Sequence, residues 1–198
     1  VAYSSLYISF LENESINIMD HLEAIVEIKN MLHPEFMNRI IDLIDNKANK
    51  NLYILSGIDK NVRNVKGHHL QLEKPTDIFY YNFIKKEIER LYYFYKAKFP
   101  KMASSKINQI DLLKYSVGGK YDIHTDHFTL APRHLSIIIN LNDNYEGGDL
   151  IFTDQKEKEI KRFKLDKGSI LFFPSNFMYP HSIQPITKGV RYSIVAWL

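Results

Sequence analysis

The sequence contains no cysteine among its 198 residues. This absence excludes disulfides, zinc-thiolate and iron-sulfur sites, and any enzyme that depends on a cysteine nucleophile. A metal ion bound by this chain would therefore need histidine and carboxylate ligands, and the sequence supplies 8 histidines and 23 acidic residues.

Long apolar runs and a strong bias of charge are also missing. No stretch approaches the roughly 18 apolar residues of a membrane span, and "VAYSSLYISFLENES" lacks the basic and apolar regions of a signal peptide. Lys and Arg exceed Asp and Glu by 26 − 23 = 3, which gives no electrostatic case for nucleic acid. We therefore expect no membrane and no nucleic-acid partner, and a cytoplasmic location. A removed targeting segment stays open, because the sequence begins with Val1.

Aromatic and apolar residues are plentiful. The chain has 13 Tyr and 12 Phe, and 45% of its residues are hydrophobic, so disorder is excluded and one globular domain of ordinary size is expected. We place this domain at residues 25–198. Residues 1–24 are interpreted as an N-terminal extension, in which "LYISF" and "SINIM" are candidate short strands.

Two segments in the first half of the chain have helical spacing. "LHPEFMNRIIDLIDNK" has Pro34 in its first turn, followed by apolar residues three and four apart: Phe36, Met37, Ile40, Ile41 and Ile44. "KPTDIFYYNFIKKEIERLYYFYKAKFP" is predicted to be capped by Thr76 or Asp77 and to end before Pro100. Its apolar face comprises Ile84, Ile88, Leu91 and Tyr95.

Between these helices, residues 51–76 are polar, contain Asn and Gly, and alternate only near their end, which suggests one strand. An ordinary surface loop and a mobile lid are both open here.

From residue 107 onward the period changes to two. Eight short runs are separated by Gly, Asn, Asp or Pro signals: "INQIDLLKYSV", "KYDIHTDHF", "HLSIIINLN", "GDLIFTD", "EIKRFKL", "GSILFFPS", "HSIQPI" and "RYSIVAWL". Many short strands at such intervals are typical of a β-sandwich or jelly roll. We therefore predict a mainly β fold with flanking helices.

"YDIHTDHF" carries His124 and Asp126 two residues apart. On a strand, residues i and i+2 project from the same face, so both side chains can reach one ion, while His127 points away. His181, in "YPHSIQP", supplies a third ligand from another strand. Two histidines and one carboxylate form the facial triad of non-haem Fe(II) oxygenases.

Arg191 lies ten residues after His181, on the strand "RYSIVAWL", and Ser193 shares its face. A guanidinium inside an apolar barrel is costly unless it meets an anion. A dicarboxylate cosubstrate would give Arg191 a bidentate partner.

At these residues the sequence resembles the 2-oxoglutarate/Fe(II)-dependent oxygenases, and among them the prolyl 4-hydroxylase-like branch. The resemblance covers about residues 25–198, through "IKNMLHPEFMNRIIDLI", "LLKYSVGGKYDIHTDHF", "SIIINLNDNYEGGDLIF" and "KGSILFFPSNFMYPHSIQPITKGVRYSIVAWL". It implies a double-stranded β-helix core of the jelly-roll, cupin-like type. It also implies three iron ligands, His124, Asp126 and His181.

The resemblance further implies that Arg191 binds the distal carboxylate of 2-oxoglutarate with help from Ser193. Tyr115 matches a family tyrosine that hydrogen-bonds the cosubstrate, and Gly147 and Gly148 match a tight turn. The implied cofactors are Fe(II), 2-oxoglutarate and O2, with ascorbate as a candidate addition.

Three positions depart from patterns in the family. Collagen-type hydroxylases carry Lys where Arg191 stands, so this chain is more similar to oxygen-sensor-like and microbial or viral members. A second family tyrosine on the strand "SIIINLN" is replaced, by Asn140 or an Ile. The DNA-repair branch has an Arg where this chain has Trp197, so alkylated-base repair is not expected.

The resemblance implies hydroxylation of a C–H bond, and we expect the substrate to be a prolyl residue in a peptide or protein. Two alternatives stay open: a hydroxylase of another amino acid or small metabolite, and a non-catalytic cupin-like metal-binding module. Fold-level similarity does not choose among substrates.

Overall fold

The computed structural model describes residues 21–30, 32–52, 57–102, 106–130 and 132–198. The first half contains η1 (His21–Ala24), β1 (Val26–Ile28), α2 (Pro34–Lys47), β2 (Lys50–Asn51), β3 (Arg63–Asn64), β4 (Lys66–His69) and α3 (Pro75–Lys98). The second half is made of strands: β5 (Gln109–Tyr115), β6 (Lys120–His124), β7 (Leu135–Asn140), β8 (Tyr145–Gly147), β9 (Leu150–Thr153), β10 (Glu159–Phe163), β11 (Ile170–Pro174), β12 (His181–Ile183), β13 (Ile186–Gly189) and β14 (Arg191–Trp197).

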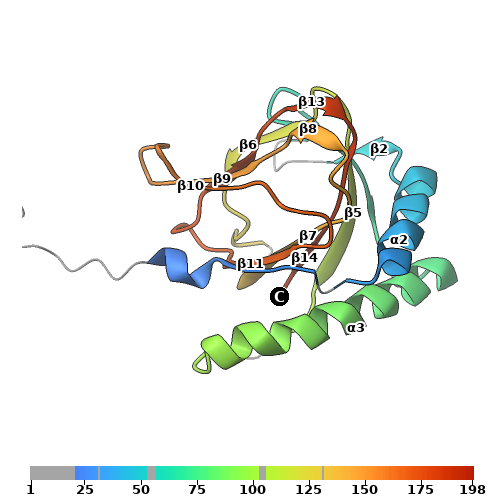
Figure 1. Cartoon of the computed structure of the whole chain (residues 1–198), viewed down its shortest axis with the longest axis horizontal. Coiled ribbons are helices and arrows are strands. Elements are labelled where there is room, and N and C mark those ends of the chain that lie inside the picture. The colour runs from blue at the N-terminus through green and yellow to red at the C-terminus, as the bar shows by residue number, and fades with distance from the viewer. Residues whose placement is uncertain (1–20, 31, 53–56, 103–105, 131) are drawn as a thin grey trace, which may run out of the picture.

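Two antiparallel sheets form the body of the molecule. The larger has seven strands in the order β1-β11-β7-β14-β5-β4-β2, and the smaller has five in the order β10-β9-β12-β6-β3. Figure 1 shows these sheets on opposite sides of a common interior, with α2 and α3 outside the larger one. The predicted fold class, a mainly β jelly roll with flanking helices, is confirmed.

All eight strands predicted from period-two runs are present, with shorter bounds. Five more strands escaped prediction: β1, β2, β3, β8 and β13. Each has only two to four residues, which is too short to display a period. Their partners in the sheets, not their own pattern, define them.

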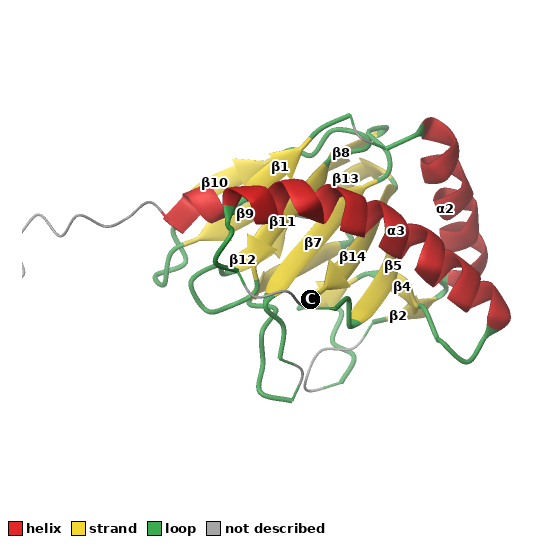
Figure 2. Cartoon of the chain, turned by 90° about the horizontal axis from the view of Figure 1, so that it is seen from below, coloured by secondary structure: helices red, strands yellow, loops and turns green. Residues whose placement is uncertain are grey.

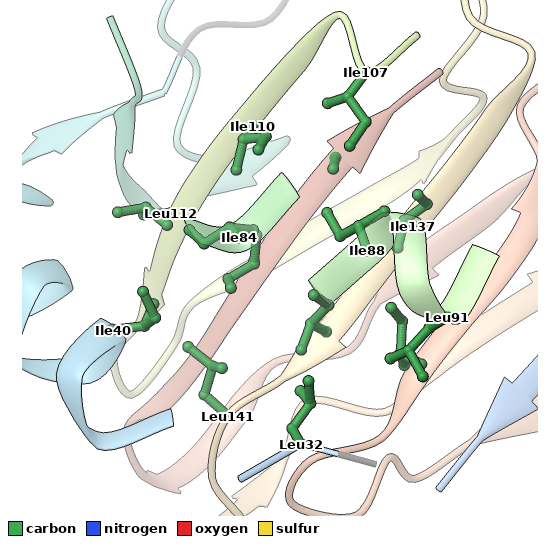
Figure 3. Close-up of a cluster of buried hydrophobic side chains, with 14 of the residues drawn as sticks. Leu32, Ile40, Ile84, Ile88, Leu91, Ile107, Ile110, Leu112, Ile137 and Leu141 are labelled. Atoms are coloured by element: carbon green, nitrogen blue, oxygen red, sulfur yellow. The ribbon is translucent and has the colours of Figure 1, made fainter. Parts of the chain in front are cut away.

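The outer core lies between the larger sheet and the two helices (Figure 3). Ile84, Ile88 and Leu91 of α3 pack with Ile40 of α2 against strand side chains such as Ile137. Figure 2 shows α3 lying across the outer face of this sheet. The helical face predicted from sequence is therefore the buried one.

Alternation along the strands sends the other half of their side chains into the interior. In β14, Ile194 and Ala196 join the outer core, whereas Arg191, Ser193, Val195 and Trp197 line an interior cavity. Period-two geometry alone thus aligns these four side chains on one face.

The ends of the helices agree with the sequence except at one cap. Pro34 is the first residue of α2, as predicted. The prediction that Thr76 or Asp77 caps α3 was wrong, because Lys74 is the N-cap and Pro75 the first helical residue. The fully buried Asp77 carboxylate instead contacts His68 at 2.8 Å and accepts from the Gln71 backbone N–H at 3.1 Å.

The segment 51–76 is more regular than its sequence suggested. β3 pairs with β6 of the smaller sheet, and β4 pairs with β5 of the larger one. Arg63–Asn64 and Lys66–His69 of this segment are therefore parts of the two sheets, while the lid stays a prediction. The candidate strands "LYISF" and "SINIM" lie outside the described residues. Within the described ranges, none of the helices has the length and apolarity needed to cross a membrane.

Candidate metal centre

His124, Asp126 and His181 come together at neighbouring strands of the smaller sheet. His124 ends β6, His181 begins β12, and the two residues are direct partners in the antiparallel ladder. Asp126 lies two residues beyond the end of β6 instead of inside the strand, as the sequence had suggested. Among the described residues, these three form the one cluster of His and acidic side chains suited to a metal.

The distances within the cluster suit a single ion. Asp126 Oδ1 lies 3.6 Å from His124 Nε2, and Asp126 Oδ2 lies 3.6 Å from His181 Nε2. The three candidate ligand atoms are all within 4.8 Å of one another. His127 is not part of the cluster, and its ring contacts the Arg133 carbonyl oxygen at 2.8 Å.

Hydrogen bonds orient both imidazole rings of the cluster. His124 Nδ1 lies 2.8 Å from the Asp122 carbonyl oxygen, and His181 Nδ1 lies 3.0 Å from that of Tyr179. A carbonyl oxygen only accepts, so each Nδ1 carries a proton and each Nε2 is the nitrogen placed to face a metal. Such outer hydrogen bonds are the usual support of histidine metal ligands.

The charge states of the cluster also suit a cation. Burial lowers the pKa of His181 to about 4, and His124 adds to this effect, so the His181 ring is neutral near pH 7. Burial alone would raise the pKa of the Asp126 carboxyl, but His181, His124 and the Ser136 hydroxyl together lower it. The cluster therefore offers a carboxylate and a neutral imidazole, which are the protonation states that ligate metals.

Ser136 is a site residue that the sequence interpretation missed. Its hydroxyl donates to Asp126 Oδ2 at 2.6 Å, and it lies 2.7 Å from the hydroxyl of Ser175. Both serines are buried. The available signal was an isolated polar residue in the apolar run "LSIIIN", which forms β7.

Arg191 lies in the interior cavity beside the cluster, with only 1% of its surface exposed. Its Nη1 donates to Ser193 Oγ at 3.3 Å, its Nε has no hydrogen-bond partner, and no acidic side chain of the described residues forms an ion pair with it. Tyr115, its direct neighbour across β5 and β14, places its ring 5.3 Å from the guanidinium carbon. Burial raises the pKa of Tyr115, so its hydroxyl stays protonated.

These observations fit a divalent metal together with an anionic co-ligand. Three converging donors match a facial triad. A buried guanidinium without a carboxylate needs an external anion. The cavity is lined by Arg63, Leu113, Tyr115, Tyr121, His124, Asp126, Ile138, His181, Ile183, Arg191, Ser193, Val195 and Trp197.

The turn around Gly148 leaves room for Arg191. Gly147 and Gly148 have φ of 77° and 70°, a region that side chains rarely adopt. A Cβ on Gly148 would press on the side chain of Ile186 and lie 3.1 Å from Arg191 Cδ. The predicted tight turn therefore also sets the space around the guanidinium stem.

Asn140, one of the two candidate replacements for the family tyrosine, faces backbone groups. Its amide donates to the carbonyl oxygens of Asn142 and Leu165 at 2.6 and 2.9 Å, and its oxygen accepts from Tyr145 at 3.2 Å. Asn140 is absent from the cavity lining, whereas Ile138 of the same strand belongs to it, so neither an Asn140 nor an Ile138 replacement would add a polar group to the cavity.

A second depression, called the mouth below, lies beside the cluster. It shares Arg63, Tyr121, His124, Asp126 and Trp197 with the inner cavity. Tyr121 stacks on His124 with 3.6 Å between ring centroids, and the Arg63 guanidinium lies 4.6 Å from the Tyr121 centroid. On the other side, the Arg133 guanidinium lies 3.7 Å from the centroid of Trp197. The sequence had not marked Arg63, Tyr121 or Arg133, because their proximity depends on the strand pairing.

Comparison with protein families supports the same interpretation of the site. Residues 110–198 match the model of the 2OG-Fe(II) oxygenase superfamily. A PKHD-type hydroxylase from Synechococcus sp. is 27% identical over 147 residues, which cover 70% of this chain and 60% of that protein. A second PKHD-type hydroxylase, from Thermosynechococcus vestitus, is 36% identical over 43% of this chain and 40% of its own length. The chain thus spans about 60% of the first curated relatives it matches.

Solved structures share the fold at low sequence identity. A Trichoplax adhaerens prolyl hydroxylase in complex with a hypoxia inducible factor oxygen degradation domain peptide superposes with a TM-score of 0.73 and 17% identity, covering 100% of this chain and 92% of that one. A Pseudomonas putida prolyl-4-hydroxylase gives 0.71 and 15%, covering 90% and 95%.

The match over residues 110–198, the relatives and the His-Asp-His cluster together support a 2-oxoglutarate/Fe(II) oxygenase. In fold the chain is similar to prolyl hydroxylases.

Proposed function

We propose that this domain is an Fe(II)- and 2-oxoglutarate-dependent dioxygenase that hydroxylates a C–H bond of a prolyl residue in a peptide or protein. The observation that carries the proposal is the shared cavity. The candidate ligands His124, Asp126 and His181 open into the same space as the buried Arg191 guanidinium, which has no acidic partner among the described residues.

The proposed roles follow from the groups each residue presents. His124, Asp126 and His181 would hold the metal, and Arg191 with Ser193 and Tyr115 would bind the distal carboxylate of the cosubstrate. When bound, Fe(II) and 2-oxoglutarate supply the activation of O2 that side chains cannot provide. The apolar residues Leu113, Ile138 and Val195 complete the wall and keep water from the reacting centre.

One hydrogen-bond donor without a partner among the described residues, on a side chain that reaches the mouth, supports a peptide substrate. Trp197 Nε1 is buried without a partner, and Trp197 lines both the inner cavity and the mouth. Arg133 stacks on its indole and is the neighbouring cation. An X-Pro segment offers carbonyl acceptors but lacks the proline N–H. Donor groups on the protein therefore suit such a peptide better than acceptor groups do. The mouth also has space beyond the cluster for flanking residues.

The test combines cosubstrate turnover with product analysis. The Fe(II) form, given O2 and 2-oxoglutarate, should add about 16 Da to proline-containing peptides and release succinate in proportion. A parallel panel of amino acids and small metabolites tests the first alternative. The matched negative control is Asp126→Ala, which removes the candidate carboxylate ligand and should abolish both signals.

Each result of this test separates the candidates. Oxygen incorporation into peptides supports the proposal, and incorporation only into metabolites assigns the domain to the alternative substrate class. Metal binding without any 2-oxoglutarate consumption would contradict the enzymatic proposal and leave the cupin-like binding module.

A further inference from the structure

The side chain of Ser136 contacts the candidate metal ligand Asp126. It is 1% exposed in β7 and lies opposite Trp197 of β14 and Phe173 of β11 in the sheet. Its hydroxyl lies 2.6 Å from Asp126 Oδ2. A carboxylate only accepts hydrogen bonds, so the proton of this bond belongs to Ser136.

Ser175 continues this contact one step further. The two serine hydroxyls are 2.7 Å apart. Because the Ser136 proton is used on Asp126, the Ser175 hydroxyl must be the donor to Ser136. Backbone bonds hold Ser175 on both sides: its N–H donates to His134 O at 3.1 Å, and its carbonyl accepts from His127 N–H at 2.9 Å. The proton order is therefore Ser175 to Ser136 to Asp126.

The two oxygens of Asp126 have different surroundings as a result. Each oxygen lies 3.6 Å from the Nε2 of one candidate histidine ligand, but Oδ2 also accepts the short hydrogen bond from Ser136, whereas Oδ1 receives none from the described side chains. For a metal bound beside both imidazoles, Oδ1 would be available without a competing hydrogen bond, whereas Oδ2 already accepts one from Ser136. The asymmetry is built by residues outside the ligand set.

We propose that Ser136, held by Ser175, keeps Asp126 a one-oxygen metal ligand and so preserves the open coordination positions of the site. This inference rests on the proposed function. A facial triad leaves three positions, and 2-oxoglutarate chelation with O2 requires all three. A carboxylate bound through both oxygens would take one of them.

The expected effect of Ser136→Ala is on the cosubstrate more than on the metal. Loss of an outer hydrogen bond of this kind typically costs about 10- to 100-fold in affinity or activity. We expect 2-oxoglutarate to bind the Mn(II) form about 10- to 100-fold more weakly, with a smaller change in Mn(II) affinity. Under anaerobic conditions, the charge-transfer absorption of the Fe(II) and 2-oxoglutarate complex should weaken and shift.

The Co(II)-substituted protein gives a readout that is independent of cosubstrate binding. Its d–d absorption reports coordination number, so Ser136→Ala should alter this spectrum in the absence of 2-oxoglutarate. Ser136→Thr keeps the hydroxyl and should restore the wild-type spectrum and affinity. Ser175→Ala should change the Co(II) spectrum and the 2-oxoglutarate affinity in the same direction as Ser136→Ala but by a smaller amount, because Ser136 still contacts Asp126.

Ser182→Ala is the matched control. Ser182 is also buried and neighbours His181, but its hydroxyl lies 3.4 Å from the Gln184 amide instead of touching a candidate ligand. The Ser182→Ala variant should leave unchanged the Co(II) absorption and the charge-transfer absorption of the Fe(II) and 2-oxoglutarate complex. A folded Ser136→Ala protein with unaltered Co(II) spectrum and 2-oxoglutarate affinity would overturn the inference.

If Ser136→Ala does not fold, Ser175→Ala decides by the same two measurements. Wild-type protein that binds Co(II) but not 2-oxoglutarate would contradict the proposed function alone, since the Co(II) spectra of the variants still test the role of Ser136.

Discussion

At the scale of single residues, Asp126 and Arg191 carry opposite charges in the same cavity and have different kinds of partner. Asp126 is surrounded by the two imidazoles and Ser136. Arg191 has a hydroxyl and an aromatic ring but no carboxylate among the described residues. The Asp126 carboxylate thus has internal partners, and the Arg191 guanidinium is the proposed partner of an external anion. This difference leads to two predictions.

Asp126→Ala should abolish metal binding and turnover while the fold is kept. Two imidazoles alone leave too few donors and no negative charge for a labile divalent ion. Isothermal titration with Mn(II) and 2-oxoglutarate consumption measure the two losses, and circular dichroism checks the fold. Decarboxylation of 2-oxoglutarate at the wild-type rate would show that the ligand set is misassigned.

Arg191→Met should remove tight cosubstrate binding and spare the metal. An unpaired buried charge on the cosubstrate costs on the order of 3 to 5 kcal/mol, so 2-oxoglutarate should bind the Mn(II) form roughly a hundredfold to several thousandfold more weakly. Arg162→Met, which removes an Arg paired with Glu159 and Asp149 on the surface, is the control. A loss of only a few fold would mean that Arg191 has a merely structural role.

At the scale of elements, short turns and strand pairings position the side chains that the strands supply. The turn at Gly147 and Gly148 clears the stem of Arg191, and the pairing of β4 with β5 brings His69 to Asp111. Neither relation involves the candidate metal ligands directly. Both can therefore be changed while the ligand set stays intact.

Gly148→Ala should weaken 2-oxoglutarate binding by displacing Arg191. Gly118→Ala is a matched control, because Gly118 has a similar φ of 77° but a Cβ there would meet no atom within 4 Å. Both variants should lose about 1 to 2 kcal/mol of unfolding free energy from the left-handed backbone. Only Gly148→Ala should also reduce cosubstrate affinity. Equal affinities in the two variants would contradict a positioning role for the turn.

The His69–Asp111 contact should make stability depend on pH. The hydrogen bond to Asp111 raises the pKa of His69 above its ordinary value of 6.5. Its contribution is therefore complete below pH 6.5 and is lost as the pH rises through the raised value. Because His69 is about half exposed, the contribution should stay below about 1 kcal/mol.

Urea unfolding of wild type and His69→Gln across this pH range measures the effect. The difference in unfolding free energy should shrink with rising pH, and Asp111→Asn should abolish its pH dependence. A difference that grows with pH would contradict this assignment.

At the scale of the whole molecule, the larger sheet carries the proposed cosubstrate residues, and the strands of the smaller sheet lead to the candidate metal ligands. β14 and β5 present Arg191, Ser193 and Tyr115, while β6 and β12 lead to His124, Asp126 and His181. A metal-cosubstrate pair would therefore bridge the two sheets. Binding there should be linked to global stability.

Mn(II) should raise the unfolding midpoint, and 2-oxoglutarate should raise it further only after Mn(II) is present. A ligand at 100 times its Kd adds about 2.7 kcal/mol, which corresponds to roughly 5 to 10 °C for a domain of this size. Differential scanning calorimetry with and without a chelator measures both steps. Equal stabilisation by 2-oxoglutarate in chelator would contradict a metal-dependent cosubstrate site.

Much of this protein follows from local pattern in the sequence. Period-two alternation between turn signals predicted eight of the strands and the shared face of Arg191 and Ser193, because neighbouring residues of a strand alternate between its faces. Apolar spacing determined the buried faces of α2 and α3 in the same way. The motif around His124, Asp126 and His181 pointed to the metal cluster before any fold was known.

Only the tertiary structure decided which distant residues meet these side chains. Ser136 contacts Asp126, and Ser175 contacts Ser136. Arg63 lies over the ring of Tyr121 and Arg133 over that of Trp197, because strands far apart in sequence pair in one register. The short strands β3, β8 and β13 exist for the same reason, since two to four residues have no period of their own. Register and chain reversal are long-range properties set by the packing of the whole core, and a local pattern of residues does not contain them.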